Sequence, residues 1–410
     1  MNKQRLSYIS TILLITFLLG TVIGQAQTPT VTTWLQPGSL TENADSTLWV
    51  DGSNYFSKNG TTGQISTNTN ATAIIQNALD VGGHIYLKAG DYYTTQDLDV
   101  TVDYTFIDGD PETRILCSSQ NYGFLVSADY VTINRVWVNG TGTMGVNGFG
   151  ITFDYGCSGG VVSNCKVTQT GLDGIHLRNC QNTTITNCIV ENTNDDCIAS
   201  LFGNDNIITN NHVSQGNTVT TNRVRGIVVG GDNGTIVMGN TVENINGVGI
   251  LIMDFTNQSL NIVVVGNNVR NTGKIAQAGY EGAGIYLQGV EGATITGNTV
   301  NEAYWSGVHL YNTSYSTITG NSIKDCGKNA TGWQGGIVLE YYSTYNVITG
   351  NIICDALGGL EYGIVETGGG TNDFNVFVSN SAFDATTLGI SLDGANSKVN
   401  LCYNGTAWLP

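Results

Sequence analysis

The chain has 410 residues, 40% of them hydrophobic, which is enough material for one extended core. Its 15 Lys and Arg against 32 Asp and Glu give a formal net charge of −17, which argues against nucleic acids and anionic membrane surfaces as partners, because both require basic patches. The 54 Gly beside only 4 Pro are typical of a chain that turns often and whose strands donate ladder hydrogen bonds.

The N-terminus has the form of a targeting signal. Lys3 and Arg5 precede an apolar run from Leu6 to Ile23, and Gly24-Gln25-Ala26 offers a small-residue cleavage site. We expect residues 1–26 to be a cleaved signal peptide, with a retained membrane anchor as the alternative. The mature protein is then secreted or held at the cell surface, with no membrane contact beyond this segment.

Two features precede the main body of the chain. Residues 27–70, with Trp49 and Tyr55 among Asn, Gly and Ser, are predicted to form an irregular β segment. Thr72–Leu79 (TAIIQNAL) places apolar residues at helical spacing and ends before two Gly, which predicts a short capping helix. Such a helix covers the open end of a repeat array, whose core and strand edges would otherwise be exposed.

One short phrase recurs along the domain predicted for residues 71–410. A small residue, mostly Gly, followed by Ile, Val or Phe opens each repeat, as at Gly174-Ile175 and Gly284-Ile285. A second phrase ending in Asn follows, as in TITN at Asn187 and TITGN at Asn298. Repeats that alternate with period two are coils of strands, and each coil buries its apolar face only against its neighbours. The fold class is therefore all-β, a solenoid of parallel strands with about eleven or twelve coils, and the Asn column indicates an internal hydrogen-bonded ladder.

Several of the nine Cys fall at corresponding positions of adjacent coils, namely Cys157 with Cys180 and Cys165 with Cys188. Adjacent strands lie about 4.8 Å apart, which is within reach of a disulfide. A ladder of stacked, buried thiols is our interpretation, and disulfides are the alternative. The sequence has neither the CxxC spacing nor the His/Cys cluster of a zinc site, so we expect no metal centre of that kind.

A column of outward-facing residues carries the first candidate site. The residue after each Gly points inward, so Ile175 belongs to the core, whereas the residue before Gly faces outward. Three consecutive coils therefore present Asp173, Asp196 and Arg225 one above another. Two like charges one strand apart raise at least one pKa, and a nearby Arg lowers it. Such an arrangement can hold one carboxyl protonated as an acid beside an ionised base.

Three neighbours complete this candidate catalytic site. Asp195 lies beside Asp196, and His176 faces outward on the same coil as Asp173. Arg178 is expected to bind substrate, or to pair with Asp154 one coil earlier. Turn capping by the Asp side chains is the alternative role for the whole cluster.

A second candidate site, for substrate binding, lies further along the chain. Its members come from neighbouring coils and are aromatic or polar: Tyr286, Trp305, His309, Tyr311 and Glu340. Exposed rings can stack on sugar faces while polar neighbours bond hydroxyl groups. The alternative is that these rings pack the longer loops of the same coils.

The segment AIIQNAL…GGHIYLKAGDYYT resembles the cap and first coil of the pectate-lyase-like, right-handed parallel β-helix superfamily, and the likeness extends over about residues 70–400. LDGIHL (172–177) and NDDCIAS (194–200) resemble the NTDG and DDCIA motifs of polygalacturonases and related inverting glycoside hydrolases. The resemblance implies that Asp195 is the general acid and that Asp173 and Asp196 activate water.

Two departures from that family concern its substrate. Val224-Arg225-Gly226 stands where polygalacturonases have GHG, and Leu251-Ile252-Met253 stands where they have RIK. The cationic pair that grips the galacturonate carboxylate is therefore missing, which favours a different, neutral glycan.

Together these patterns predict a secreted carbohydrate-active protein, a polysaccharide-cleaving enzyme of glycoside hydrolase type. The alternatives are a non-catalytic glycan-binding adhesin or spike, a polysaccharide lyase or epimerase, and a structural envelope protein. We expect no cofactor, and any calcium would be held by the Asp cluster. We expect inversion at the anomeric carbon, with Asp195 projecting away from the other two carboxylates and leaving about 6.5–9.5 Å between acid and base.

Overall fold

The computed structural model describes residues 44–118, 122–141, 148–154, 156–215, 224–255, 259–273, 282–328, 335–400, 402–403 and 408–409. The expected signal peptide, residues 1–26, lies outside the described residues, as does the first part of the segment 27–70. Among the helices of the described part, none is long and apolar enough to span a membrane.

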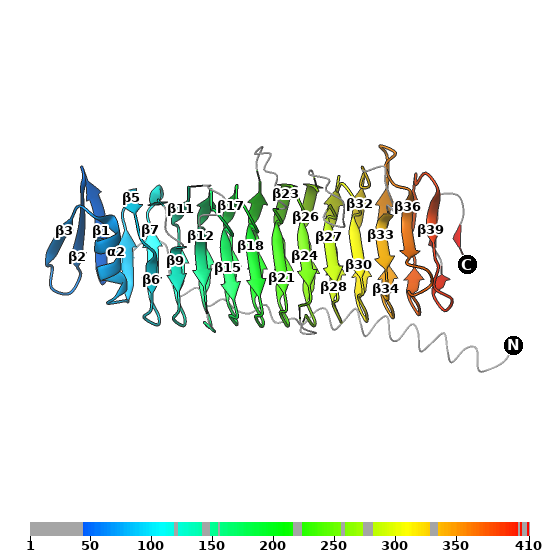
Figure 1. Ribbon diagram of the computed structural model, residues 1–410, viewed down its shortest axis with the longest axis horizontal. Helices are drawn as coiled ribbons and strands as arrows, with labels where there is room; N and C mark the ends of the chain where they lie inside the picture. The colour runs from blue at the N-terminus through cyan, green and yellow to red at the C-terminus, as the bar shows by residue number, and fades with distance from the viewer. Residues whose placement is uncertain are drawn as a thin grey trace. The chain divides into compact units, whose positions relative to one another are not determined.

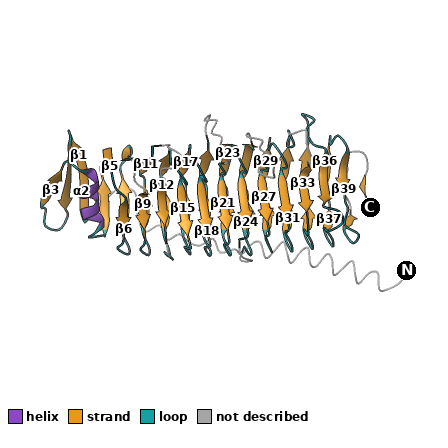
Figure 2. Ribbon diagram, in the orientation of Figure 1, coloured by secondary structure: helices purple, strands orange, loops and turns teal. Residues whose placement is uncertain are grey.

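A hairpin and a helix form the N-terminal end of the described chain (Figure 2). β1 (Ser46–Asp51), β2 (Asn54–Asn59) and β3 (Ile65–Asn68) pair antiparallel, and β1 also pairs parallel with β4 (His84–Leu87). The described part of the segment 27–70 is thus regular β structure that continues a sheet of the solenoid, and the expectation of an irregular segment is wrong there.

The predicted capping helix is confirmed as α2 (Ala71–Leu79). Asn70 begins it, because its side chain accepts a hydrogen bond from the backbone N–H of Ala73, one of the donors left open at a helix N-terminus. Ile74 and Ile75 are buried against the first coils. The helix therefore covers apolar surface at this end of the core.

Within the described residues, the remaining strands form three long sheets in which sequence neighbours belong to different sheets. Sheet A has 16 strands, of which those after β3 are β4, β7 (Phe106–Gly109), β10 (Thr132–Asn134), β13 (Val161–Ser163), β16 (Thr184–Thr186), β19 (Ile207–Thr209), β22 (Ile236–Met238), β25 (Val263–Val265), β28 (Thr294–Thr296), β31 (Thr317–Thr319), β34 (Val347–Thr349), β37 (Val376–Val378) and β40 (Lys398–Asn400).

Sheet B has 14 strands: β5 (Gly90–Thr94), β8 (Thr113–Cys117), β11 (Trp137–Asn139), β14 (Lys166–Thr168), β17 (Ile189–Glu191), β20 (His212–Ser214), β23 (Thr241–Ile245), β26 (Asn268–Thr272), β29 (Thr299–Asn301), β32 (Ser322–Lys324), β35 (Ile352–Cys354), β38 (Ser381–Phe383), β41 (Cys402–Tyr403) and β42 (Trp408–Leu409).

Sheet C has 12 strands: β6 (Leu98–Val100), β9 (Tyr122–Val126), β12 (Phe149–Phe153), β15 (Ile175–Arg178), β18 (Ile198–Leu201), β21 (Ile227–Gly230), β24 (Ile250–Met253), β27 (Ile285–Gln288), β30 (Val308–Tyr311), β33 (Gly335–Glu340), β36 (Tyr362–Thr367) and β39 (Leu388–Ser391).

The chain runs through A, B and C in turn, so one pass through the three sheets makes one coil, and successive coils stack along the solenoid (Figure 1). The strands of sheet C pair parallel in an unbroken series, one from each coil, in agreement with the predicted eleven or twelve coils. Ile175 and Ile285 are fully buried, so the predicted inward facing of the residue after Gly is confirmed.

The Asn column is an internal ladder, as predicted. Asn298 donates its side-chain N–H groups to the backbone oxygen of Val264 and to Oδ1 of Asn321, at 3.0 Å each. Asn321 makes the equivalent bonds to Ile295 and Asn351. Each buried amide thus links the coil before it to the coil after it, and its polar atoms are paired.

The cysteines are free thiols, and seven of the nine are buried. Cys165 and Cys188 occupy stacked positions in the core, as do Cys157 and Cys180. Burial raises the pKa of the Cys188 thiol well above its ordinary value. The predicted ladder of buried thiols is therefore the arrangement present, rather than disulfides.

Candidate functional site

The three aspartates occupy the corner between sheets B and C. Asp173 lies between β14 and β15, and Asp195 and Asp196 lie between β17 and β18. The parallel register pairs Ile175 with Ile198, so Asp173 and Asp196 stand at equivalent positions of neighbouring coils. The sequence-predicted cluster is therefore brought together by the stacking of two coils.

Each member of the cluster touches another. The backbone N–H of Asp196 donates to Oδ1 of Asp173 at 3.0 Å, and Nδ1 of His176 lies 2.7 Å from Oδ2 of Asp173. In the next coil, Nε of Arg225 lies 2.7 Å from Oδ1 of Asp196, and Nη2 lies 3.5 Å from Oδ1 of Asp195. The column thus contains the ion pair of Arg225 with Asp196 and the contact of His176 with Asp173, and the backbone N–H of Asp196 links the two.

The carboxylates lie closer together than inversion requires. Asp173, Asp195 and Asp196 each offer an oxygen, and these oxygens all lie within 4.8 Å of one another. Asp195 therefore does not project away from the other two, and the expected gap of about 6.5–9.5 Å is not formed. The reason is the coil turn, which directs consecutive residues 195 and 196 toward the same coil neighbour.

Burial separates the roles that the three carboxyl groups can play. Asp173 and Asp196 are both only 5% exposed, whereas the side chain of Asp195 is 47% exposed. Burial and the charge of Asp173 raise the pKa of Asp195 above its ordinary value, and Arg225 offsets this in part. Asp195 is thus the carboxyl group that can meet a solute and exchange a proton with it.

The effect of Arg225 on Asp196 is weaker than the sequence led us to expect. The sequence predicted that a nearby Arg lowers the pKa of the stacked aspartates. Burial, reinforced by the charge of Asp173, instead raises the pKa of Asp196 well above its ordinary value, although Arg225 lowers it. Desolvation outweighs the ion pair because Asp196 is enclosed on all sides.

Two buried polar atoms beside the cluster have no hydrogen-bond partner among the described residues. They are Nε2 of His176 and Oγ1 of Thr152, which belong to residues only 8% and 3% exposed. Thr152 pairs with His176 in the register of β12 and β15, so the two side chains are neighbours on the outer face of sheet C. A hydroxyl group or a water bound there would satisfy both atoms. Sequence reasoning missed Thr152, and its place in the same outward column as His176 was the available signal.

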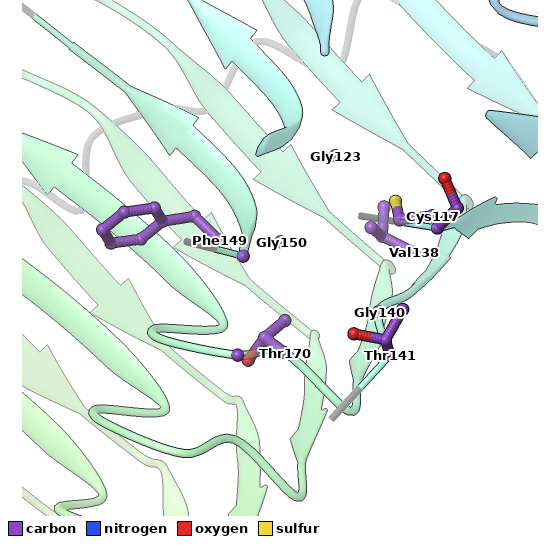
Figure 3. Close-up of a pocket in the computed structure, with 11 residues that line it drawn as sticks. Cys117, Gly123, Val138, Gly140, Thr141, Phe149, Gly150 and Thr170 are labelled. Atoms are coloured by element: carbon purple, nitrogen blue, oxygen red, sulfur yellow. The ribbon is translucent and has the colours of Figure 1, made fainter. Parts of the chain in front are cut away.

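A small cavity lies on the N-terminal side of the cluster, and Figure 3 shows the residues that line it. It offers about 20 Å³ to the centres of water-sized molecules, and its lining includes Phe149, Thr170 and Gly171. The ring of Phe149 stacks on Tyr122 at 5.2 Å and meets the edge of the His176 ring at 5.4 Å. Phe149 thus lines the cavity and contacts His176, which in turn contacts Asp173.

Arg178 pairs with a carboxylate of its own chain. Its Nε donates to Oδ1 of Asp154 at 2.6 Å, and its Nη2 also contacts that carboxylate. This is the pairing that the sequence offered as the alternative to substrate binding. The guanidinium remains 40% exposed at the edge of sheet C, so its predicted contact with substrate stays a prediction.

The second candidate site is brought together but is more enclosed than predicted. Tyr286 and His309 pair in register, as do Tyr311 and Glu340, and Nε2 of His309 lies 3.0 Å from Oε2 of Glu340. Tyr286, His309 and Glu340 are buried, so the expectation of exposed rings is wrong for Tyr286. Trp305, which lies over Gly282, and Tyr311 stay partly exposed. The cause is lateral packing, because Tyr286 lies within an apolar cluster on the outer face of sheet C.

The Asp cluster also has the ligand type that calcium prefers, namely carboxylate oxygen. Calcium takes about six to eight oxygens, and here Arg225 and His176 already contact oxygens of all three aspartates. These two side chains thus compete with calcium for the oxygens, and calcium binding stays a prediction.

The fold and the repeat pattern match one protein family. Residues 150–279 and, in an overlapping match, residues 225–404 fit the family described as "Right handed beta helix region". The chain belongs to this family. Its coils are therefore right-handed, and the resemblance to the pectate-lyase-like superfamily is confirmed at the level of fold.

Solved β-helix structures are similar to this chain over most of its length. The A-module of the Azotobacter vinelandii mannuronan C-5 epimerase AlgE4 matches with a TM-score of 0.68 and 18% identity, covering 81% of this chain and 96% of that one. The Dettilon tailspike protein matches with a TM-score of 0.63 and 18% identity, covering 80% and 65%. The periplasmic alginate epimerase AlgG matches with a TM-score of 0.55 and 12% identity, covering 78% and 76%.

At these identities the likeness establishes the fold and no more. No curated protein matches this chain by sequence. Its chemistry therefore rests on its own residues.

Proposed function

We propose that this protein is an extracellular carbohydrate-active enzyme that hydrolyses a glycan at the corner between sheets B and C, with Asp195 as the acid. The observation that carries the proposal is a half-exposed carboxyl group with a raised pKa beside a buried carboxylate that is hydrogen-bonded to His176. Pairs of carboxyl groups whose environments differ in this way are the acid and base of glycoside hydrolysis. A mannuronan C-5 epimerase and an alginate epimerase are among the similar structures, which supports a polysaccharide as partner.

In this mechanism, protonated Asp195 donates its proton to the glycosidic oxygen as the bond from the anomeric carbon to that oxygen breaks. An oxygen of Asp173 forms a bond to the anomeric carbon as the bond to the leaving oxygen breaks, and His176 and the backbone N–H of Asp196 hold this carboxylate in place. Asp195 then takes a proton from a water that adds to the anomeric carbon, and the bond between this carbon and Asp173 breaks. The close spacing of the carboxylates fits the separation of about 5–5.5 Å found in retaining enzymes, so we now expect retention rather than inversion.

The charges around the site favour a neutral glycan. Arg225 contacts Asp195 and Asp196, and Arg178 contacts Asp154, so these guanidinium groups are engaged by carboxylates of the chain itself. A uronate carboxylate would meet a net negative surface at this corner. Nε2 of His176, together with Oγ1 of Thr152, instead suits a neutral hydroxyl group.

The experiment measures the release of reducing ends from a panel of neutral and acidic polysaccharides, in EDTA and in calcium chloride. Cleavage of a neutral glycan that is lost in Asp195→Asn and kept in Asp205→Asn is the expected result. Asp205 is exposed and lies one turn beyond β18, so it is a matched control. Glycan binding without turnover would replace the proposal with an adhesin, an unsaturated product absorbing in the ultraviolet would replace it with a lyase, and altered sugar stereochemistry in an uncut chain would replace it with an epimerase.

A further inference from the structure

The outer face of sheet A is free of charge over most of its length. From β10 to β37 each strand buries its middle residue and points its first and last residues outward, and of these outward residues only Thr209 is buried. These outward residues are Thr132, Asn134, Val161, Ser163, Thr184, Thr186, Ile207, Thr209, Ile236, Met238, Val263, Val265, Thr294, Thr296, Thr317, Thr319, Val347, Thr349, Val376 and Val378. We call this surface the sheet A face. It consists mainly of Thr and aliphatic β-branched residues, and it has no aromatic ring.

Strand propensity alone does not explain the absence of charge, because sheet B provides an internal control. The strands of sheet B are equally short and parallel and belong to the same coils. Their outward positions include charged residues in coil after coil: Arg114, Lys166, Glu191, Glu243, Arg270 and Lys324. β-branched residues are favoured on both sheets, so the exclusion of charge is a property of the sheet A face.

The border of the sheet A face toward sheet B is neutral as well. The residue after each strand from β13 to β37 has a positive φ, which makes a tight turn, and it is always Asn, Gly or Ser: Asn164, Asn187, Asn210, Gly239, Gly266, Gly297, Gly320, Gly350 and Ser379. These side chains are short and uncharged, so none of them brings a charge to the face. The first charged residue on this border is Arg135, after β10, which pairs with Asp108.

The spacing of the sheet A face is regular in two directions. Neighbouring strands lie about 4.8 Å apart, and outward residues within one strand lie about 6.6 Å apart. The parallel register holds without a slip, as in Thr294–Thr317 and Thr296–Thr319. The result is a fixed grid of methyl and hydroxyl groups that the core behind it holds in place.

We propose that the sheet A face binds ice. Apolar groups order the water beside them without bonding to it, and hydroxyl groups can replace water molecules in a hydrogen-bonded layer. A charged group would impose its own hydration shell on that layer, so a face that joins a neutral water lattice must exclude charge, as this one does. A repeating grid on a rigid support fits a repeating partner, because neither side must be ordered on binding.

Two other occupants fit the observations less well. The sheet A face spans nine strand spacings of about 4.8 Å and is about 10 Å wide, so its area is roughly 400 Å² per copy. Face-to-face pairing of two copies would therefore bury roughly 800 Å². This is below the range of about 1,200–2,000 Å² for a stable interface. A solid glycan would be held mainly by aromatic rings; the strands of the face have none, and the exposed stack of Tyr315, Tyr345 and Phe374 lies in the turns before β31, β34 and β37. The Asp cluster also lies at the B–C corner, the one corner that does not border the sheet A face.

The test follows the full-length chain, fluorescently labelled, into slowly grown ice, and measures thermal hysteresis in parallel. Thr296→Lys with Thr319→Lys places two charges on adjacent strands of the face. Thr299→Lys with Ser322→Lys is the matched control, at outward positions of sheet B in the same two coils. We expect wild type and control to enter the ice alike, and the face variant to enter at least about tenfold less, because a Lys charge must be stripped of its hydration there.

Exclusion of the wild-type chain from ice, or equal incorporation of the two Lys variants, would overturn the proposal. Two further results would also overturn it. One is binding of the wild-type chain to microcrystalline cellulose that only the face variant loses. The other is a wild-type dimer on size-exclusion chromatography that only the face variant loses. If circular dichroism shows that the face variant is not folded, Thr319→Tyr replaces it. Tyr is neutral and favours strands as Thr does, but its larger side chain projects beyond the neighbouring residues of the face. The Thr319→Tyr variant should therefore also lose ice incorporation.

Discussion

The protein buries polar side chains in two regions that follow opposite rules. In the Asn ladder at the end of sheet A, the side-chain amides of Asn298 and Asn321 form hydrogen bonds with neighbouring coils, so that each donor has an acceptor. At the corner between sheets B and C, like charges are stacked on one another, and Nε2 of His176 has no partner within the described chain. Buried polar groups with hydrogen-bond partners hold the coils together. Buried polar groups that lack a partner or face a like charge can instead bind a ligand or exchange a proton.

The largest expected effect is on glycan turnover, which should depend on the corner between sheets B and C and not on the Asn ladder. Asp195→Asn should lower glycan turnover by about 10²–10⁴-fold, the contribution typical of a positioned general acid. Its melting temperature should change little, because the side chain is half exposed. Initial rates of reducing-end release and a thermal melt measure both quantities. A large loss of stability with little loss of rate would show that Asp195 stabilises the fold and does not take part in catalysis.

Asn321→Ala should show the opposite pattern. The change leaves its buried partners on the coils of Asn298 and Asn351 unpaired, so the free energy of unfolding should fall by about 2–4 kcal/mol. Turnover per folded molecule should be unchanged. Urea unfolding checks the first statement, and Asn268→Ala, at an exposed position of sheet B, is the control that should cost less than about 0.5 kcal/mol. A stable Asn321→Ala protein would show that the ladder does not hold the coils.

The pH dependence of stability sharpens the comparison further. Burial raises the pKa of Asp196 above 3.8, so the folded state binds this proton more tightly than the unfolded state. That contribution is fully present below the unfolded pKa and is lost as pH rises through the raised folded pKa. Wild type should therefore lose stability relative to Asp196→Asn as pH rises from about 3 to 8. A difference in melting temperature that stays constant over this range would contradict the assignment.

The smallest effect compares two buried serines. Oγ of Ser306, in the same column as Asp196, has no partner among the described residues, whereas Oγ of Ser316 accepts from Ala293 and donates to Ser314. Ser316→Ala should cost about 1 kcal/mol, and Ser306→Ala should be neutral or slightly stabilising. Paired urea titrations measure the difference. Equal costs would mean that pairing is not what distinguishes the two regions.

Several features of the site could be read from the sequence, and the reason is register. Ile175, Ile198 and Ile227 recur with the coil, so the residues before them had to share one column and Asp173 had to meet Asp196. The distances could not be read in the same way. Sequence gave no indication of how the turn before β18 would direct Asp195, and the closeness of the three carboxylates overturned the expected gap.

The amino-acid pattern alone determined the solenoid, the inward residues, the Asn ladder and the capping helix, because each depends on local alternation and on stacking of like positions. Only the tertiary structure decided which outward side chains are enclosed. Tyr286 and His309 are buried by lateral neighbours, and the pKa of Asp196 rises despite Arg225 because desolvation depends on everything packed around the carboxyl group. Spacing along the chain fixes the column in which a residue lies, and the depth of its burial depends on contacts between coils.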